Sequence, residues 1–320
     1  MKYRKINSTG IEVSEVSLGC WTIGGKSWDN GRSTGYADVN KKDAIEALLF
    51  ARELGVNHFD TADSYGFGNS ERLLGGAFEN INDVYISTKI GNNGGTSEHP
   101  YKSMHIRHQC EQSLENLKRE FVDIYYFHHP YFGNNDMYLD EAVETMCKLK
   151  KEGKIRYIGL SAYSDGDFER LCPVIKPDII QAEGNMAQAR FIKKGGTAER
   201  VGLKAAVTSP LIMGILTGRY AAEKPPYFLN GDHRKEDPRF SKEFLVLTEK
   251  RLEKIKQRFG GSNEELTRTA ISYVLSFDSV CCVMPGFRNK KQILTNVSAS
   301  DMKLTAEDIE YIEKVFSEEI

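Results

Sequence analysis

Residues 40–66, NKKDAIEALLFARELGVNHFDTADSYG, contain one helix and one strand in an arrangement that recurs along the chain. Asn40 can cap a helix that runs from Lys41 to Leu54, and Gly55 can end it. The apolar positions of this helix share one face, which holds Ile45, Leu48 and Leu49. A short strand, His58 to Asp60, follows and ends in a carboxylate. A helix joined to a strand in this way is the building unit of a parallel sheet.

Short apolar runs that end in polar or small residues predict the strands of this sheet. There are eight: Val16 to Gly19, His58 to Asp60, Val84 to Lys89, Ile124 to His128, Tyr157 to Ser161, Ile179 to Ala182, Leu203 to Val207 and Val280 to Met284. Most are followed by a helical segment, and further helices are expected to start at Ser70, Ser103, Leu139, Asp165 and Phe191. Eight such units in 320 residues favour a closed α/β barrel of the (β/α)8 TIM type over an open sheet. We therefore expect one barrel domain over residues 1–320.

Some segments lie outside the strand–helix repeat. Tyr3 to Glu15 alternates on both sides of Ser8-Thr9-Gly10, which predicts an N-terminal β-hairpin that closes the floor of the barrel. Lys242 to Phe259 predicts an extra helix. The capping boxes Ser262-x-x-Glu265 and Thr305-x-x-Asp308 each lead into an apolar helix face.

The stretch from Ser209 to Ser241 is too long for an ordinary connection between a strand and a helix. It contains the turn-forming pairs Pro225-Pro226 and Asn230-Gly231. Loops of this length inside a folded domain are commonly functional, so we expect a lid over the site.

The composition excludes several classes of function. Acidic and basic residues nearly balance, with a formal net charge of −2 and a pI near 6.4, so no field would attract nucleic acid or an anionic membrane. No run approaches the roughly 20 apolar residues of a membrane helix, and no secretory segment follows the basic N-terminus. The six cysteines show no C-x-x-C or zinc spacing, which indicates reduced thiols in a cytoplasmic protein. No stretch indicates an oligomeric state.

Four residues at or just after predicted strands can form a proton-transfer site: Asp60, Tyr65, Lys89 and His128. A phenol has an unperturbed pKa of about 10 and is a weak acid at neutral pH. A lysine cation beside it favours the phenolate, and a carboxylate keeps that lysine charged and oriented. A histidine can then orient a substrate oxygen or share its developing charge. This combination predicts an enzyme.

Barrel geometry can bring these four residues together, because the active sites of such barrels lie at the carboxyl ends of the strands. Asp60, Lys89 and His128 end three consecutive predicted strands, and Tyr65 lies in the loop after the strand of Asp60. Each residue alone has a structural explanation: a capping carboxylate, a packed phenol, a solvated strand end or a buried imidazole. Their joint placement favours the catalytic interpretation.

The chain resembles the aldo-keto reductases around these positions, and the resemblance runs from the first hairpin to the last helix. The family pattern is D-x-A-x-x-Y-G, then S-T-K and then H-x-P, and the matching residues are Asp60, Tyr65, Lys89 and His128. Further matches are Gly68-Asn69-Ser70-Glu71, Gly159-Leu160-Ser161, Gly214-Ile215-Leu216-Thr217-Gly218 and Pro285-Gly286-x-Arg288-Asn289. The opening Trp21-Thr22-Ile23-Gly24-Gly25-x-x-Trp28 is similar to the bacterial branch that acts on assorted aldehydes.

The resemblance implies hydride transfer from a reduced nicotinamide cofactor to the carbonyl carbon of a small aldehyde or ketone, with Tyr65 as the proton donor. Lys89 and Asp60 would tune the phenol, and His128 would hold the carbonyl. The cofactor-binding residues implied in the same way are Ser161, Gln181, Ser209, Leu211, Gly214, Gly286, Arg288, Gln292 and Asn296. A guanidinium suits a 2′-phosphate, so Arg288 favours NADPH over NADH.

Three positions depart from the family pattern of cofactor binding. Ala162 stands where an asparagine usually follows Ser161, and Thr208 stands where a tyrosine commonly stacks on the nicotinamide. Met213 stands where this branch often has an arginine. We therefore expect a cofactor that is bound more weakly, or posed differently, than in a typical member.

Aromatic residues in the predicted loops indicate the substrate pocket. Trp28, Tyr131 and Phe132 are expected to ring the mouth, and His129 is expected either as a wall of the pocket or as a packing residue. Together they favour aromatic, aldose-like or other flat, apolar carbonyl compounds, while packing against helices is the alternative for each ring. His105-x-x-His108 lacks further ligands, so no metal site is expected.

Two other classes of function are compatible with the sequence. Some proteins of this fold keep the cofactor as a redox signal and act as regulatory subunits, and the departures at the cofactor site suit that alternative. Such a sensor would oxidise its cofactor very slowly with every carbonyl compound. A barrel enzyme that forms a Schiff base would need an uncharged Lys89, and the neighbouring Tyr65 argues against that chemistry.

Overall fold

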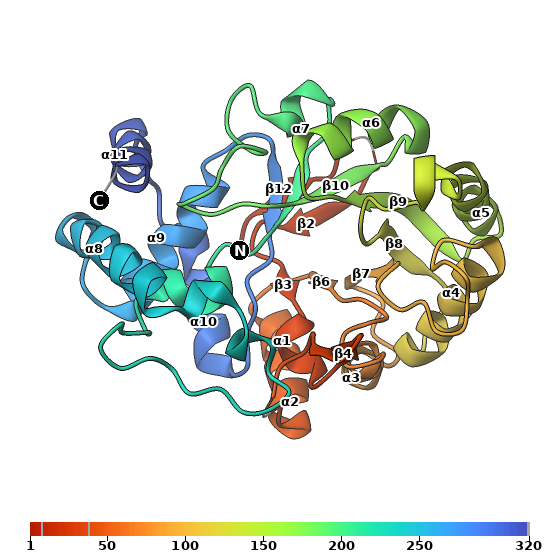
Figure 1. The fold of residues 1–320 in the computed structure, drawn as a ribbon, viewed down its shortest axis with the longest axis horizontal. Helices are drawn as coiled ribbons and strands as arrows, with labels where there is room; N and C mark the ends of the chain where they lie inside the picture. Colours follow the sequence, from red (N-terminus) through yellow and green to blue (C-terminus); the bar gives the residue numbers. More distant parts are fainter. Residues whose placement is uncertain (8, 38, 319–320) are drawn as a thin grey trace.

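The computed structural model describes residues 1–7, 9–37 and 39–318, and its centre is a barrel of parallel strands (Figure 1). The barrel strands stand side by side in the same order in which they occur in the sequence. Among the described residues the barrel has eight strands: β3 (Leu18–Gly19), β6 (His58–Asp60), β7 (Tyr85–Ile90), β8 (Val122–Phe127), β9 (Ile155–Ser161), β10 (Ile179–Glu183), β11 (Ala205–Thr208) and β12 (Val280–Val283). The ring closes through the parallel bridges Val16–Val283 and Gly19–Gly286. The predicted barrel is confirmed.

Helices surround the strands (Figure 1). They are α1 (Trp21–Gly24), α2 (Lys41–Glu53), α3 (Asn69–Ala77), α4 (Ser103–Leu117), α5 (Leu139–Lys151), α6 (Asp165–Ile175), α7 (Thr197–Arg200), α8 (Lys242–Phe259), α9 (Asn263–Leu275), α10 (Lys290–Ser298) and α11 (Ala306–Ser317). The extra helix is confirmed as α8, and the capping boxes at Ser262 and Thr305 both form. None of the helices in the described ranges is long and apolar enough to span a membrane.

Helix α2 shows how this outer layer packs. Asn40 caps it as predicted, because its side chain accepts hydrogen bonds from the amides of Lys42 and Asp43. Leu49, predicted to share an apolar face with Ile45 and Leu48, is 36% exposed. The buried residues of this helix are Ala44, Ala47, Leu48 and Ala51. The apolar face and the buried face therefore differ at Leu49, and small alanines, which allow close approach, form most of the buried face.

The prediction that a helix starts at Phe191 was wrong. Phe191 is fully buried in a loop and packs edge-on against Phe168 of α6, with ring centroids 5.7 Å apart. The chain then turns at Gly195, whose φ of +73° suits glycine, and α7 starts only at Thr197. The apolar side chain of Phe191 therefore anchors a loop rather than opening a helix.

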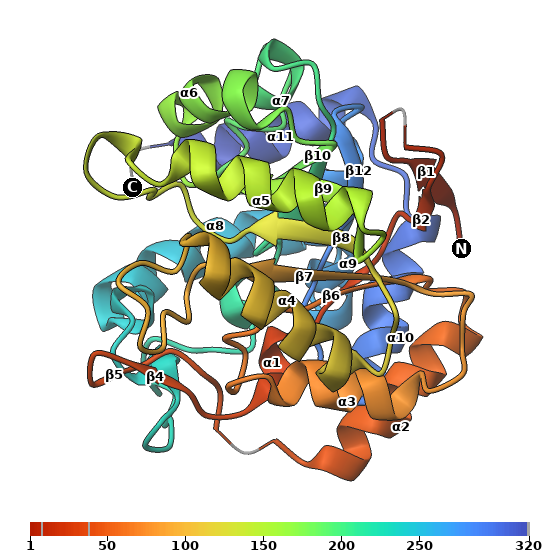
Figure 2. The ribbon, with the colours of Figure 1, turned by 90° about the vertical axis from the view of Figure 1, so that its right-hand side faces the viewer.

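The N-terminal hairpin closes one end of the barrel. Strands β1 (Tyr3–Lys5) and β2 (Glu12–Ser14) pair antiparallel, and Ser8, part of the predicted turn, lies outside the described residues. The buried side chains of Ile6, Ile11 and Val13 pack against interior residues of the barrel, namely Ile124, Tyr126, Ile179, Ala206 and Cys282. Figure 2 shows this hairpin at the opposite end of the barrel from the small hairpin of β4 (Trp28–Asp29) and β5 (Arg32–Ser33). The hairpin thus forms the floor that the sequence predicted.

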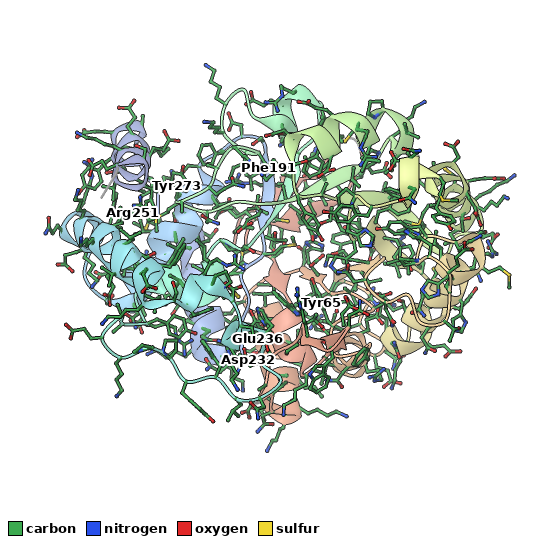
Figure 3. All side chains as sticks on the ribbon, viewed as in Figure 1. Tyr65, Phe191, Asp232, Glu236, Arg251 and Tyr273 are labelled. Carbon is green, nitrogen blue, oxygen red and sulfur yellow. The ribbon has the colours of Figure 1, made fainter. Side chains whose placement is uncertain are left out.

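Residues 209–241, predicted as a lid, form a segment that crosses to the loop before α2. This lid segment contains the 3-10 turns η2 (Ile212–Thr217), η3 (His233–Lys235) and η4 (Pro238–Phe240). The His233 amide donates to the Gly35 carbonyl at 2.9 Å, and the Ala37 amide donates to Asp232 Oδ2 at 3.2 Å. Figure 3 shows Asp232 and Glu236 on this segment, below Tyr65 in that view. The contacts hold the segment beside the mouth, and its opening and closing remain a prediction.

Candidate active site

Lys89 connects three groups at the carboxyl end of the barrel. Its side chain is fully buried and extends from β7 into the interior. The ammonium nitrogen lies 2.5 Å from Asp60 Oδ2, 2.6 Å from the Thr61 carbonyl oxygen and 3.3 Å from the Tyr65 hydroxyl. An ammonium has three N–H donors, so these contacts use all of them. The ion pair is formed across neighbouring parallel strands, β6 and β7.

The loop after β6 places Tyr65 above this ion pair. The next residue, Gly66, has a φ of +61°, and a Cβ there would lie 1.8 Å from the Gly24 carbonyl oxygen. Only glycine fits such a turn without displacing the backbone. On its other side Tyr65 stacks on Trp21, with ring centroids 6.0 Å apart and planes 27° from parallel. The phenol is therefore held by packing as well as by Lys89.

Burial and charge together set the ionisation of Lys89 and Tyr65. Burial is the largest single effect on Lys89 and disfavours its charge, but the charge interactions and hydrogen bonds with Asp60 and Tyr65 together outweigh it, so the pKa of Lys89 is raised and the group is an ammonium. Burial also raises the pKa of the Tyr65 phenol above its ordinary value, and the Lys89 charge only partly opposes this. The expectation that Lys89 would favour the phenolate is thus corrected in its net direction. Tyr65 keeps its proton at neutral pH and can act as an acid.

His128 follows β8 and stands edge-on to Tyr65, with ring centroids 5.8 Å apart. It is buried, and burial together with the nearby Lys89 charge sets its pKa well below the ordinary value. Its Nδ1 atom has no hydrogen-bond partner among the described residues. A neutral imidazole has one N–H donor, which can bind a carbonyl oxygen placed between His128 and Tyr65.

A cavity of about 610 Å³ opens from this cluster. Its lining includes Asp60, Tyr65 and Trp21, and residues at the start and in the first turns of α10. The predicted cofactor residues on its walls are Ser209, Leu211, Gly214, Gly286, Arg288, Gln292 and Asn296. The cavity therefore brings most of the predicted cofactor residues to one continuous surface with Tyr65.

Ser161 and Gln181, also predicted to bind the cofactor, lie beneath this surface. Ser161 is buried at the end of β9. The Gln181 amide on β10 donates to Asp60 Oδ1 at 3.0 Å. In this structure Gln181 therefore belongs to the hydrogen-bond network of the carboxylate, and a contact of either residue with a carboxamide remains a prediction.

The turn after β11 forms a strained wall of the cavity. Ser209, Ile212 and Met213 have positive φ values of 55°, 45° and 53°. Such conformations cost about 1–3 kcal/mol for residues other than glycine and occur mainly where a site requires them. Met213 contacts His233 further along the same lid segment, with 2.9 Å between Sδ and Nε2. This contact therefore joins the first turn of the lid segment, which forms the cavity wall, to its later part.

Arg288 tests whether the cavity fits an anionic cofactor. Its side chain is 30% exposed, lies over the ring of Tyr36 and is 3.9 Å from Asp232 Oδ2. Burial lowers its pKa, and its Nη2 atom has no hydrogen-bond partner among the described residues. A buried guanidinium nitrogen without a hydrogen-bond partner, on the wall of a cavity, suits a phosphate oxygen. The residues present therefore fit a nicotinamide dinucleotide, although Thr208 and Met213 offer it neither a ring nor a charge.

Some lining residues were not predicted from the sequence. Tyr36 and Arg234 line the cavity, and Arg234 binds both carboxylate oxygens of Asp232, at 2.8 and 2.7 Å. Arg234 and Asp232 do not belong to a sequence motif. They reach the site only because the lid segment folds beside it. Trp21 belongs to a quoted motif, but its stacking on Tyr65 was not foreseen.

The predicted substrate residues separate into two groups. Trp28 on β4 and Tyr131 after β8 are 48% and 65% exposed, as expected for rings at a mouth. Phe132 takes the packing alternative, because it is fully buried and stacks on Tyr101 with ring centroids 4.5 Å apart. His129 takes the packing alternative, since its Nε2 lies 2.9 Å from the Gly91 carbonyl oxygen and its ring lies against Tyr101.

Comparisons with known proteins identify the family of this chain. Residues 15–316 match the model of the aldo/keto reductase family. Aldo-keto reductase YhdN of Bacillus subtilis is 28% identical, with 96% of this chain and 91% of that one aligned. NADH-specific methylglyoxal reductase of Escherichia coli is 28% identical over 96% of each chain. The holo form of an aldo-keto reductase from Bacillus halodurans has a TM-score of 0.77 at 24% identity, covers 98% of this chain and 96% of its own, and supports the fold alone. The protein belongs to the aldo/keto reductase family and is an oxidoreductase.

Proposed function

We propose that this protein reduces the carbonyl group of a small aldehyde or ketone, with Tyr65 as the proton donor and NADPH as the preferred cofactor. The observation that carries the proposal is the contact of the buried Lys89 ammonium with both Asp60 and the Tyr65 hydroxyl. A phenol in that position can release a proton and leave its charge beside a fixed cation. Charge that develops next to a preorganised cation is stabilised without reorganisation.

The chain's own residues supply the acid and the orientation. The nicotinamide cofactor, when bound, supplies the hydride. Tyr65 donates its hydroxyl proton to the substrate oxygen as negative charge grows there, and Lys89 stabilises the remaining phenolate. Neutral His128 donates a hydrogen bond to the same oxygen and so holds the carbonyl beside Tyr65.

Aromatic side chains around the mouth support flat, apolar or aldose-like substrates. Trp21 belongs to α1 and Trp28 to β4. The ring centroids of Tyr131 and Tyr163 lie 6.3 Å apart. Stacking on such rings favours planar groups. The opening motif and the bacterial relatives support the aldehyde-reducing branch as the finer assignment.

The test is oxidation of NADPH and NADH by the purified protein with a panel of aromatic aldehydes, short dicarbonyls and sugars. We expect saturable turnover with at least one of these classes. Tight cofactor binding without turnover on any member of the panel would contradict the reductase and favour a redox-sensing regulatory subunit.

The pH dependence follows from the raised pKa of Tyr65. Carbonyl reduction needs the protonated phenol, which is the form present below that pKa. We expect kcat for reduction to be flat through neutral pH and to fall only on the alkaline side, whereas alcohol oxidation, which needs the phenolate, rises with pH. Rate profiles in both directions check this, and a reduction rate that falls between pH 6 and 8 would contradict it.

Cofactor preference can be tested at Arg288. Arg288→Gln removes the guanidinium, and the loss of one charge-assisted contact is expected to weaken NADPH binding about 10–100-fold while NADH binding changes little. Fluorescence titration with both cofactors measures the dissociation constants. Lys290→Gln is the matched control, because it removes a charge from the same helix start but its ammonium pairs with Glu46 at 3.1 Å. Equal weakening of both cofactors would mean that Arg288 does not select NADPH.

A further inference from the structure

A chain of hydrogen bonds continues from the catalytic carboxylate toward the floor of the barrel. Ser87 Oγ donates to Asp60 Oδ1 at 2.7 Å. On its other side Ser87 Oγ lies 3.1 Å from His58 Nε2. His58 Nδ1 lies 3.0 Å from Ser17 Oγ and 3.8 Å from Cys282 Sγ. All of these side chains are fully buried or nearly so.

The direction of the protons in this chain follows from the charge of Asp60. Asp60 is paired with Lys89 and is a carboxylate, so it can only accept. The single hydroxyl proton of Ser87 therefore points to Asp60, and Ser87 can only accept from the imidazole. His58 must then carry its proton on Nε2. The order of donation is His58 to Ser87 to Asp60, and each donor strengthens the next.

Among the described residues, this chain of hydrogen bonds does not reach solvent. At its far end Ser17 Oγ lies 3.0 Å from the carbonyl oxygen of Ser14, a buried residue on the barrel floor. A proton released near Tyr65 has no exit in that direction. These hydrogen bonds are therefore suited to orienting the Asp60 carboxylate and spreading its negative charge, and not to carrying protons.

We propose that His58 and Ser87 are positioning residues that extend the catalytic cluster. They hold the Asp60 carboxylate in place, so that the positive charge of Lys89 stabilises the Tyr65 phenolate fully. Asp60 receives donors from Ser87 and Gln181 on Oδ1 and from Lys89 on Oδ2. Each donor takes up part of the negative charge of the carboxylate. When the Ser87 hydroxyl is removed, more of that charge acts on the Lys89 ammonium, and the phenolate of Tyr65 is less stabilised.

The positioning role rests on the proposed function, and the experiment distinguishes a failure of the positioning role from a failure of the proposed function. Ser87→Ala is expected to lower kcat about tenfold, with a smaller effect on KM, and to move the alkaline limb of the reduction profile to higher pH. Thr88→Val is the matched control on the same strand. Thr88 Oγ1 donates to the buried Glu71 at 2.7 Å, so this variant also loses a buried hydroxyl–carboxylate bond, but one outside the cluster.

The titration of Tyr65 gives a second readout that needs no turnover. The chain has 15 tyrosines, and in ring-labelled protein the NMR signal absent from Tyr65→Phe identifies Tyr65. Other titratable groups that face it are Lys89, Asp60, Cys20, His128 and Tyr163. Ser87→Ala is expected to raise the midpoint of the Tyr65 signal, and Thr88→Val to leave it unchanged.

His58 provides the rescue test. His58→Leu removes the donor to Ser87 and is expected to act like Ser87→Ala but more weakly, whereas His58→Gln keeps an amide N–H and should restore much of the wild-type behaviour. Wild-type values in Ser87→Ala, or equal changes in Thr88→Val, would overturn the positioning role. If the wild-type protein reduces no carbonyl compound, the proposed function fails, and the NMR titration still decides the role of Ser87.

Discussion

Tyr65→Phe is expected to lower kcat for carbonyl reduction by about 10²–10⁴-fold, because a positioned general acid typically contributes that much to the rate. The substitution removes one oxygen and keeps the ring that stacks on Trp21. Cofactor affinity should therefore change little. Steady-state kinetics and a fluorescence titration of the cofactor, made on the same preparation, measure the two effects.

A second tyrosine provides the control for Tyr65→Phe. Tyr125 on β8 is fully buried, and its hydroxyl has no hydrogen-bond partner within the described part of the chain. Tyr125→Phe removes the same atoms from a comparable environment and should leave kcat unchanged. Full activity in Tyr65→Phe would show that another group delivers the proton.

Lys89→Met is expected to abolish measurable turnover and also to destabilise the fold. Asp60 would remain as a buried charge that has lost its cation, which typically costs about 3–5 kcal/mol of unfolding free energy. The phenolate of Tyr65 would also lose the only ammonium that contacts its hydroxyl among the described residues. Denaturant unfolding and steady-state kinetics measure the two losses separately.

Two further variants show whether the cost comes from the unpaired charge. The double variant Asp60→Asn/Lys89→Met removes both charges, so it should recover part of the stability and none of the activity. Lys148→Met breaks an exposed pair with Glu144, with 2.7 Å between the charged atoms, and should change stability by less than about 1 kcal/mol. A Lys89→Met protein as stable as the Lys148→Met protein would mean that the buried pair contributes little to the fold.

The sequence determined the architecture because its signals are local. A strand run that ends in a polar residue, such as His58 to Asp60, and a helix start such as Ser262 depend on neighbours within a few positions. Repeated eight times, these signals specify a barrel, and the barrel rule then places Asp60, Tyr65, Lys89 and His128 at one mouth. The matching motifs predicted roles for these four residues and for Arg288.

The sequence could not determine which side chains meet across the barrel. Ser87 lies between His58 and Asp60 only because β6 and β7 pair in one register, and Gln181 reaches Asp60 from a strand 121 residues away in the sequence. Adjacent aromatic residues also separated, since Tyr131 faces solvent and Phe132 is buried.

Local sequence patterns also could not predict whether the pKa of Tyr65 lies above or below its ordinary value. The Lys89 charge alone predicts a lowered pKa, but the phenol is buried and desolvation outweighs that charge. The amino-acid pattern was therefore enough to predict the barrel and the four residues that meet at its mouth. The partners of these residues, their burial and hence their protonation states followed only from the folded molecule, because register, side-chain packing and solvent exclusion arise from contacts between distant segments.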